Sequence, residues 1–521
     1  MEKTFRACLP SIADIIFLAV FIILSSIVGK GLLADADTGY HIRAGEFIIE
    51  TMTVPKHDVF SFRSPSLPWT AHEWLSEVIM GLIHKSFGLT GIVIFFSFAI
   101  ASVYFVLFKI VQTTKGNILS SILIVSLVTA ASMVHWLARP HIFSLLLTMV
   151  WYHLLDTYQH DKGNYLYFLP PLMLLWVNLH AGFIVGFVLL GVYLSGNLFG
   201  SVAASEAQKK KRRCMVLVLT LTLTVCLLAS LVNPYGYKIL LFPFSLVSNR
   251  YIMDHVVEFQ SPDFHAVMPF RYLVYATLAI LGISRGRLNP IELMLILLFT
   301  HMALYSARYI LLFAIIAAPI LVRQTERIVS KTEGKWMDFL KIRSKNIALL
   351  DASAKGYVWP TMAILVVCVL AAKGKIAYGF DKRIKPVAAV EFMKREDLKG
   401  HMFNNDEFGD YIIYATWPKY KVFLDGRSDM YGSVKVEEYF KVAWLRPDWE
   451  KVIEKYNINW IIYNTKSALS TFLLASKEWR LIYSDRVANI FVKNTLDNQP
   501  IITRYPDIKP TLEENETTES N

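Results

Sequence analysis

The chain has 521 residues, of which 54% are hydrophobic and only 18% are charged, whereas a soluble domain has about 25% charged residues. This composition disfavours a soluble fold for the whole chain. The formal net charge of +11 does not indicate nucleic-acid binding, because the Lys and Arg residues gather in short loops and form no basic stripe with interleaved aromatics.

Long apolar runs recur from the N-terminus to residue 372, and several are long enough, with their flanks, to cross roughly 30 Å of hydrocarbon. The sequence therefore predicts an α-helical polytopic membrane protein with about eleven transmembrane helices. We place them near 12–32, 89–112, 118–135, 141–158, 165–179, 182–200, 214–232, 271–284, 289–306, 308–322 and 357–372.

The basic loops orient these spans. If the N-terminus with Lys3 and Arg6 is cytoplasmic, the alternation of spans places every basic loop in the cytoplasm, as the positive-inside rule requires. These loops carry Lys115, Lys162, residues 209–213, Arg285 and residues 323–345. The same alternation places the first loop, 33–88, and everything after about 373 on the extracytoplasmic side.

The first outer loop begins with Asp35-Ala36-Asp37-Thr38-Gly39-Tyr40-His41. Acids at a membrane edge are costly and indicate function. A carboxylate here can act as a general base toward a hydroxyl. Alternatively, Asp35, Asp37 and His41 can bind a divalent cation, Mn or Mg, because oxygen and imidazole ligands suit these ions. The plainer alternative is an exposed loop in which the two acids only add solubility.

The end of this loop predicts an amphipathic helix along the membrane surface, because its apolar residues recur at helical spacing. These residues are Trp74, Leu75, Val78, Ile79, Leu82 and Ile83. Glu73, Glu77 and His84 align on another face, where we interpret Glu77 and His84 as solvated.

Histidines are frequent in the predicted outer segments, namely His41, His72, His135, His141 and His180. They indicate a metal site or hydrogen bonds to a sugar, although no zinc-type spacing links them. The plain alternative is that such residues anchor the chain at the membrane boundary.

After Lys373 short apolar strands alternate with helical stretches, which predicts an extracytoplasmic α/β domain over 373–500. The expected strands are 402–403, 421–424, 460–463, 479–483 and 488–492, and the expected helices are 386–397, 434–444, 448–456 and 467–476. The transmembrane domain then covers 1–372, including the 33–88 loop, and a polar, disordered tail covers 501–521.

The segment Asp425-Gly426-Arg427-Ser428-Asp429 follows one of these expected strands. A turn there can expose both acids and Arg427 toward a ligand, or Asp425 and Arg427 can form a structural pair. The glycine spacing matches no phosphate loop, which argues against a nucleotide site.

Several motifs together resemble a bacterial membrane family related to the GT-C superfamily of glycosyltransferases. In the first loop they are Gly45-Glu46-Phe47-Ile48, Pro55-Lys56-His57-Asp58-Val59-Phe60-Ser61 and Trp69-Thr70-Ala71-His72-Glu73-Trp74-Leu75-Ser76-Glu77. Between the spans they are Trp176-Val177-Asn178-Leu179-His180-Ala181-Gly182, Asn233-Pro234-Tyr235-Gly236 and Ser306-Ala307-Arg308, and in the C-terminal domain Phe403-Asn404-Asn405, Gly409-Asp410-Tyr411 and Asp425-Gly426-Arg427-Ser428-Asp429-Met430-Tyr431.

This resemblance implies an enzyme of the bacterial inner membrane that transfers a sugar from a polyprenyl-phosphate-linked donor to an acceptor hydroxyl on a lipid, glycan or protein. Asp37 is then the first candidate for the general base and Asp35 the second. Arg139 and Arg308 are candidates to bind the leaving phosphate, because a guanidinium fork matches its geometry. Snorkelling of Arg308 to the interface is the alternative. The remaining candidates for substrate binding are His41, His72, Glu73, His180, Asp425 and Arg427.

Two other functions stay open. A transporter or flippase of a lipid-linked or polar solute commonly has inverted repeats and broken helices at mid-membrane, and the sequence shows no obvious repeat. A noncatalytic envelope scaffold, whose soluble domain docks a partner, would have no need of the paired acids in the first loop.

Overall fold

The computed structural model describes residues 9–114, 116–200, 205–266, 268–284, 286–354 and 357–511. The chain forms two compact units. The helical unit contains residues up to 32, 90–247 and 253–377, and the mixed unit contains 33–89, 248–252 and the chain from 378 onward. The 33–88 loop therefore packs with the C-terminal domain, whereas the sequence grouped it with the spans. Lys3, Arg6, Lys115, Arg285 and residues 512–521 of the expected tail lie outside the described residues.

Helices of the helical unit coincide with the predicted spans, except α10 (Lys238–Ser248) and α15 (Lys335–Ser353), which lie in segments that the sequence assigned to loops. The coinciding helices are α2 (Ile12–Ile22), the second half of α4 (Trp74–Gln112), α5 (Ile118–Ser132), α6 (His141–Gln159), α7 (Leu169–Leu179), α8 (Ile184–Gly200), α9 (Glu206–Ser230), α12 (Pro269–Ile283), α13 (Pro290–Tyr305), α14 (Ile310–Lys331) and α16 (Val358–Ala372). Among the described residues, five helices, or six if α15 and α16 form one bent span, are long and apolar enough to cross a membrane. The count of eleven spans stays a prediction.

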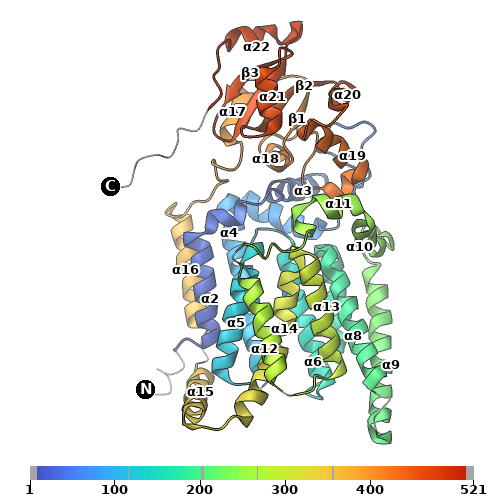
Figure 1. The fold of residues 1–521 in the computed structure, drawn as a ribbon, viewed down its shortest axis with the longest axis vertical. Helices are drawn as coiled ribbons and strands as arrows, with labels where there is room; N and C mark the ends of the chain where they lie inside the picture. Colours follow the sequence, from blue (N-terminus) through green and yellow to red (C-terminus); the bar gives the residue numbers. More distant parts are fainter. Residues whose placement is uncertain are drawn as a thin grey trace. The chain divides into compact units, whose positions relative to one another are not determined.

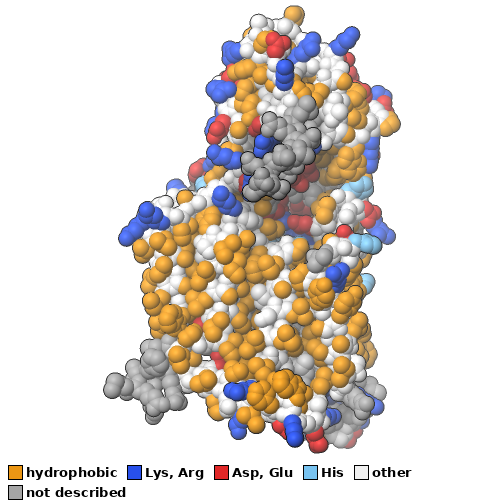
Figure 2. Space-filling model, turned by 60° about the vertical axis from the view of Figure 1, so that its left-hand side comes forward, with side chains coloured by type: hydrophobic (Ala, Val, Ile, Leu, Met, Phe, Trp, Pro, Cys, Tyr) orange, Lys and Arg blue, Asp and Glu red, His pale blue; other side chains and the backbone are white. Residues whose placement is uncertain are grey.

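The helical unit has an apolar centre and an apolar surface. Every side chain of α14 from Ile310 to Val322 is buried, against the neighbouring helices α5, α12 and α13 (Figure 1). On the outside, Leu123 is 72% exposed and Leu217 is 71% exposed, and hydrophobic side chains cover much of the face drawn in Figure 2. Exposed contiguous apolar surface of this kind suits lipid rather than water. The protein is a membrane protein.

The mixed unit contains a four-stranded sheet in the order β1-β2-β4-β3. Its strands are β1 (His401–Asn404), β2 (Ile458–Asn464), β3 (Trp479–Ser484) and β4 (Ala488–Lys493). β1 pairs with β2 in parallel, and the other two pairs are antiparallel. The helices of this part are α17 (Val387–Glu396), α18 (Asp406–Thr416), α19 (Ser428–Ala443), α20 (Trp449–Lys455), α21 (Ala468–Ala475) and α22 (Gln499–Arg504).

Four of the five expected strands are confirmed, and the strand expected at 421–424 is wrong. Val422 makes a single parallel bridge with Ser61, and its N–H donates to the carbonyl of Phe60 at 3.1 Å. The N–H of Phe423 donates to Oδ1 of Asn404 at 2.8 Å. This apolar run is buried, but its backbone bonds to a loop and to a side chain instead of a strand. At the other end, residues 501–504 of the expected tail belong to α22.

Two helices in the 33–89 segment position the candidate site residues of the mixed unit. Helix α3 (Thr38–Thr51) was not expected from the sequence, while the expected amphipathic helix is the first part of α4, which breaks at Gly88 with φ 61° and ψ −161°. The helices α3 and α4 cross at two glycines: a Cβ at Gly45 would lie 1.8 Å from the carbonyl oxygen of Glu77. Only glycine permits this approach, which brings the start of α3 beside the start of α4.

Candidate functional site

A buried chain of histidines and glutamates lies where α3 meets α4. His41 is 1% exposed, Glu73 7% and Glu77 2%. The Nδ1 atom of His41 lies 3.2 Å from Oε1 of Glu77, and its Nε2 atom lies 3.5 Å from Oε2 of Glu73. His72 Nε2 lies 3.6 Å from the other oxygen of Glu73. Burial lowers the pKa of His41, against the attraction of the Glu73 carboxylate.

The solvated face expected for Glu77 and His84 is wrong, because both side chains contact α3. Glu77 meets His41, and His84 Nδ1 lies 2.7 Å from Oε1 of Glu46. A helix that carries a full apolar stripe was expected to turn its polar face to water. The glycine crossing instead brings a second helix against that polar face.

Asp37 lies directly before α3 and is 8% exposed, whereas Asp35 is partly exposed. A Cβ at Gly426 would lie 2.1 Å from Oδ1 of Asp37 and 3.2 Å from Oδ2 of Asp410. The structure therefore places the Asp37 carboxylate against the 425–427 turn, in a space that glycine leaves open. Burial raises the pKa of Asp410, and the charge of Asp425 raises it further.

A buried lysine accompanies these acids. Lys385 is 3% exposed, and burial lowers its pKa while the charges of Asp410 and Asp35 oppose that effect. Lys385 was not singled out in the sequence, because it belongs to the charged stretch Asp381-Lys382-Arg383-Ile384-Lys385, whose pattern does not distinguish a buried lysine from an exposed one.

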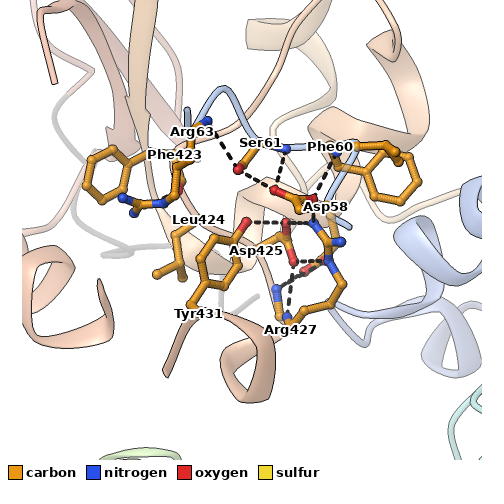
Figure 3. Close-up of polar contacts among 12 residues, drawn as sticks. Asp58, Phe60, Ser61, Arg63, Phe423, Leu424, Asp425, Arg427 and Tyr431 are labelled. Atoms are coloured by element: carbon orange, nitrogen blue, oxygen red, sulfur yellow. Dashed lines mark hydrogen bonds and ion pairs between the residues drawn. The ribbon is translucent and has the colours of Figure 1, made fainter. Parts of the chain in front are cut away.

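Asp425 and Arg427 form the structural pair that the sequence left open as an alternative. The Arg427 guanidinium donates from Nε to Oδ1 of Asp425 at 2.8 Å and from Nη2 to Oδ2 at 2.7 Å. Nη2 also donates to Oδ1 of Asp58 at 2.9 Å (Figure 3). The hydroxyl of Tyr431 donates to Asp425 at 2.7 Å. These bonds join the 33–89 segment to the C-terminal part of the same unit.

Asp58 is held as a carboxylate in this network. Burial opposes its ionisation, but Arg427 and hydrogen bonds from Ser61 and from the Phe60 N–H outweigh burial and lower the pKa of Asp58. The sequence offered Asp58 only as part of the Pro55–Ser61 motif. Its partner is 369 residues away, so no local pattern could identify the pair.

A second group of charges lies in the helical unit. Arg139 forms an ion pair with Oε1 of Glu258, and Arg308 Nη1 lies 3.9 Å from Oε2 of the same carboxylate. The Arg308 guanidinium also lies over the ring of Phe259, 5.4 Å from its centroid. Burial opposes ionisation of Glu258, but Arg139 and Arg308 outweigh burial and lower its pKa to about 2. The structure thus brings together the two arginines that the sequence proposed separately.

The three candidate histidines of the helical unit, His135, His141 and His180, contact the backbone, and His180 also contacts a side chain. His135 Nε2 lies 3.0 Å from the carbonyl of Ala307, and His141 Nε2 lies 3.0 Å from the carbonyl of His135. Nδ1 of His180 lies 2.7 Å from the hydroxyl of Ser144 and accepts from the N–H of Gly182 at 2.9 Å. A role of His180 in substrate binding stays a prediction.

The group of possible metal ligands in the structure differs from the set expected from the sequence. Among the described residues, the group of His, Cys, Asp or Glu close enough to share a metal ion is His41, Glu73 and Glu77. It retains His41 from the predicted set and contains neither Asp35 nor Asp37. The signal available in the sequence was the spacing of four between Glu73 and Glu77, which puts both acids on one helical face.

No family model matches the chain, and no curated protein matches it. Solved structures are similar in fold. Oligosaccharyltransferase AglB from the archaeon Archaeoglobus fulgidus, in complex with an inhibitory peptide and a dolichol-phosphate, is 11% identical with a TM-score of 0.56, over 87% of this chain and 69% of that one. The apo form of the Archaeoglobus fulgidus oligosaccharyltransferase is 12% identical with a TM-score of 0.54, over 93% and 74%.

The chain has a GT-C-like fold. The expected resemblance to the GT-C superfamily is confirmed at this level. ArnT from Cupriavidus metallidurans, bound to undecaprenyl phosphate, is 10% identical with a TM-score of 0.48, over 92% of this chain and 97% of that one. Identities this low establish the fold alone, so the roles of individual residues rest on the geometry of this chain.

Proposed function

We propose that the protein is a membrane glycosyltransferase that moves a sugar from a polyprenyl-phosphate-linked donor to an acceptor hydroxyl on the extracytoplasmic side of the bacterial inner membrane. The observation that carries this proposal is the GT-C-like fold, shared with an oligosaccharyltransferase solved with dolichol-phosphate. In this proposal Asp37, a buried acid directly before α3, is the catalytic carboxylate that the GT-C resemblance implies for the first outer loop.

Asp37 is the general base in this proposal. Its carboxylate takes the proton of the acceptor hydroxyl as the oxygen attacks the anomeric carbon, and the bond from that carbon to the donor phosphate breaks with its electron pair on the phosphate. Gly426 supports the assignment, because a Cβ there would lie 2.1 Å from Oδ1 of Asp37 and would displace that carboxylate. Asp35 is the second candidate and lies in a more exposed position.

Arg139 and Arg308 bind the donor phosphate in this proposal. Negative charge grows on the leaving phosphate, and fixed cations aimed at that charge stabilise the transition state. The two guanidiniums share one carboxylate, that of Glu258, so the group keeps an excess of positive charge for an anion. His72 and His180 are proposed to contact the sugar. A divalent cation, Mn or Mg in the sequence prediction, would supply further charge at the phosphate.

The test is a deletion strain complemented with variants. Comparison of envelope glycans with and without the gene identifies the missing sugar and its acceptor. Asp37→Asn should fail to restore that glycan, with transfer reduced by about 100-fold or more because a positioned base contributes about 10² to 10⁴. Glu50→Gln, at an exposed position of α3, is the matched control and should restore it.

Membrane abundance and thermal melting of both variants separate loss of chemistry from loss of fold. Full transfer by the Asp37→Asn variant would remove Asp37 as the base. Movement of a lipid-linked solute in proteoliposomes without any chemical change would instead favour the flippase, and an unchanged glycan profile in the deletion strain would favour the scaffold.

A further inference from the structure

We propose that His41, Glu73 and Glu77 bind one divalent transition-metal ion within the mixed unit. One ligand atom from each of the three side chains lies within 4.8 Å of the other two. The inference stands on these ligands, so it does not depend on the proposed glycosyl transfer.

One of the measured distances fits a pair of metal ligands. In a tetrahedral site with metal–ligand bonds of about 2.0 to 2.2 Å, the ligand atoms lie about 3.3 to 3.6 Å apart. His41 Nε2 lies 3.5 Å from Oε2 of Glu73, whereas Nδ1, on the other side of the ring, lies 3.2 Å from Oε1 of Glu77. An ion needs one imidazole nitrogen, and the other nitrogen then donates to a carboxylate, the usual arrangement of a ligating histidine.

A second, independent observation that indicates a bound cation is an unsatisfied oxygen of Glu77. Its Oε2 atom is buried and has no hydrogen-bond partner, while the side chain is 2% exposed. A buried carboxylate oxygen left without a donor costs free energy. A bound cation satisfies this oxygen, and its charge offsets that of two carboxylates brought together in a site of low polarity.

The site is held by rigid elements. His41 lies in the first turn of α3, Glu77 lies in the first turn of α4, and Glu73 directly precedes α4, four residues before Glu77. The glycine crossing fixes the two helices against each other, since a Cβ at Gly81 would lie 2.8 Å from the backbone nitrogen of Glu46. His72 lies 3.6 Å from the second oxygen of Glu73 and holds that carboxylate in place.

The ligand chemistry selects the class of ion. Imidazole nitrogen favours transition metals, and carboxylate oxygen favours harder ions, so one histidine with two glutamates suits Mn²⁺ or Zn²⁺. Mg²⁺ prefers oxygen ligands and water in a near-ideal octahedron. The chemistry therefore narrows the Mn or Mg of the sequence prediction toward transition metals.

Equilibrium dialysis of the full-length protein in detergent tests the proposal. After chelation, wild-type protein is dialysed against Mn²⁺ or Zn²⁺ and its metal content is measured by mass spectrometry. We expect about one ion per chain for at least one of the two metals, because the described residues contain one such ligand set. Glu77→Gln, which keeps the size of the side chain, should lower the affinity at least tenfold.

His84→Gln is the matched control, because His84 and Glu46 form another His–Glu pair between the same two helices. This variant should bind metal as wild type does. Melting temperatures without metal show that both variants fold. Metal content well below one ion per chain in the wild type, or equal loss in the His84→Gln variant, would overturn the proposal.

A spectroscopic measurement on the wild type covers the case in which Glu77→Gln does not fold. Mn²⁺ bound to the protein should show electron-spin coupling to an imidazole nitrogen, and the coupling constant should change when histidine is labelled with ¹⁵N. Bound Mn²⁺ without nitrogen coupling would exclude His41 as a ligand and overturn the site as proposed.

Discussion

Arg427 and Glu258 are the centres of two charge clusters with opposite composition. In the mixed unit, one guanidinium lies between the carboxylates of Asp58 and Asp425, and all three side chains are at most 1% exposed. In the helical unit, one carboxylate lies between two guanidiniums, and its side chain is 32% exposed. The first cluster has one negative charge in excess and the second one positive.

We propose that the difference separates a structural network from a phosphate-binding site. The oxygens of Asp58 and Asp425 receive bonds from Arg427, Tyr431, Ser61 and the backbone of Phe60, and the guanidinium lies over Trp69 at 4.6 Å. A network this enclosed cannot reach a substrate without opening. Arg308 is 31% exposed and its contact with Glu258 is long at 3.9 Å, so an anion can reach it. Burial and partners, rather than residue type, distinguish the two arginines.

The largest expected effect is that of Arg427→Met. It leaves two buried carboxylates without a counter-charge, and breaking a buried ion pair from one side costs about 3 to 5 kcal/mol. Arg427→Lys should cost less, because the ammonium keeps the positive charge, although it cannot donate the paired hydrogen bonds of the guanidinium. Unfolding of the full chain in detergent measures both. A Met variant that melts like wild type but fails in transfer would assign Arg427 to substrate binding instead.

A second contrast lies between Asp58 and Asp410, whose pKa values shift in opposite directions. Asp58→Asn removes a charge that the fold uses and should cost about 1.5 to 3 kcal/mol, the range for hydrogen bonds to charged groups. Asp410→Asn should cost less than about 1 kcal/mol, because burial already favours the protonated, neutral form of Asp410.

The pH dependence checks this contrast. Since the pKa of Asp410 in the folded chain is raised above about 3.9, its value in the unfolded chain, the folded state keeps a proton that the unfolded state releases. The free energy of unfolding of the wild type should therefore fall as the pH rises above about 4. Asp410→Asn should remove this contribution. The free energy of unfolding of the variant should therefore increase relative to that of the wild type as the pH rises. Parallel curves for the two proteins would contradict it.

Features that depend on neighbouring residues in the sequence were predicted, and features that depend on contacts between distant residues were not. The helices of the membrane part follow from long apolar runs, which need no partner to be recognised. Helix α3 was missed because its buried face includes Gly39, His41 and Gly45, which carry no apolar stripe. The residues of the candidate site were mostly named, but not their grouping, because His41 and Glu77 are 36 residues apart. They lie close together because α3 and α4 cross at Gly45 and Gly81, and this crossing cannot be predicted from either segment alone.

The smallest expected effect concerns the exposed cluster. Glu258→Gln removes the carboxylate that competes with a phosphate for Arg139 and Arg308. Because a partly exposed ion pair contributes about 0.2 to 1 kcal/mol, we expect binding of a polyprenyl phosphate to tighten by about 1.4- to 5-fold at low salt. Titration of the protein in nanodiscs measures the affinity, and Glu206→Gln, an exposed partner of Lys209 in the same unit, is the control.

Salt and pH decide whether the gain comes from freed arginines. Raising the salt concentration should shrink the difference between the Glu258→Gln variant and the wild type, because screening weakens exposed ion pairs. The pKa of Glu258 is lowered to about 2, so the carboxylate stays charged between pH 5 and 8, and a pH dependence of the difference over that range should follow the second ionisation of the phosphate, near pH 6. If the variant instead bound the phosphate more weakly, Glu258 would be the residue that positions both guanidiniums, and the exposed cluster would be structural like that of Arg427.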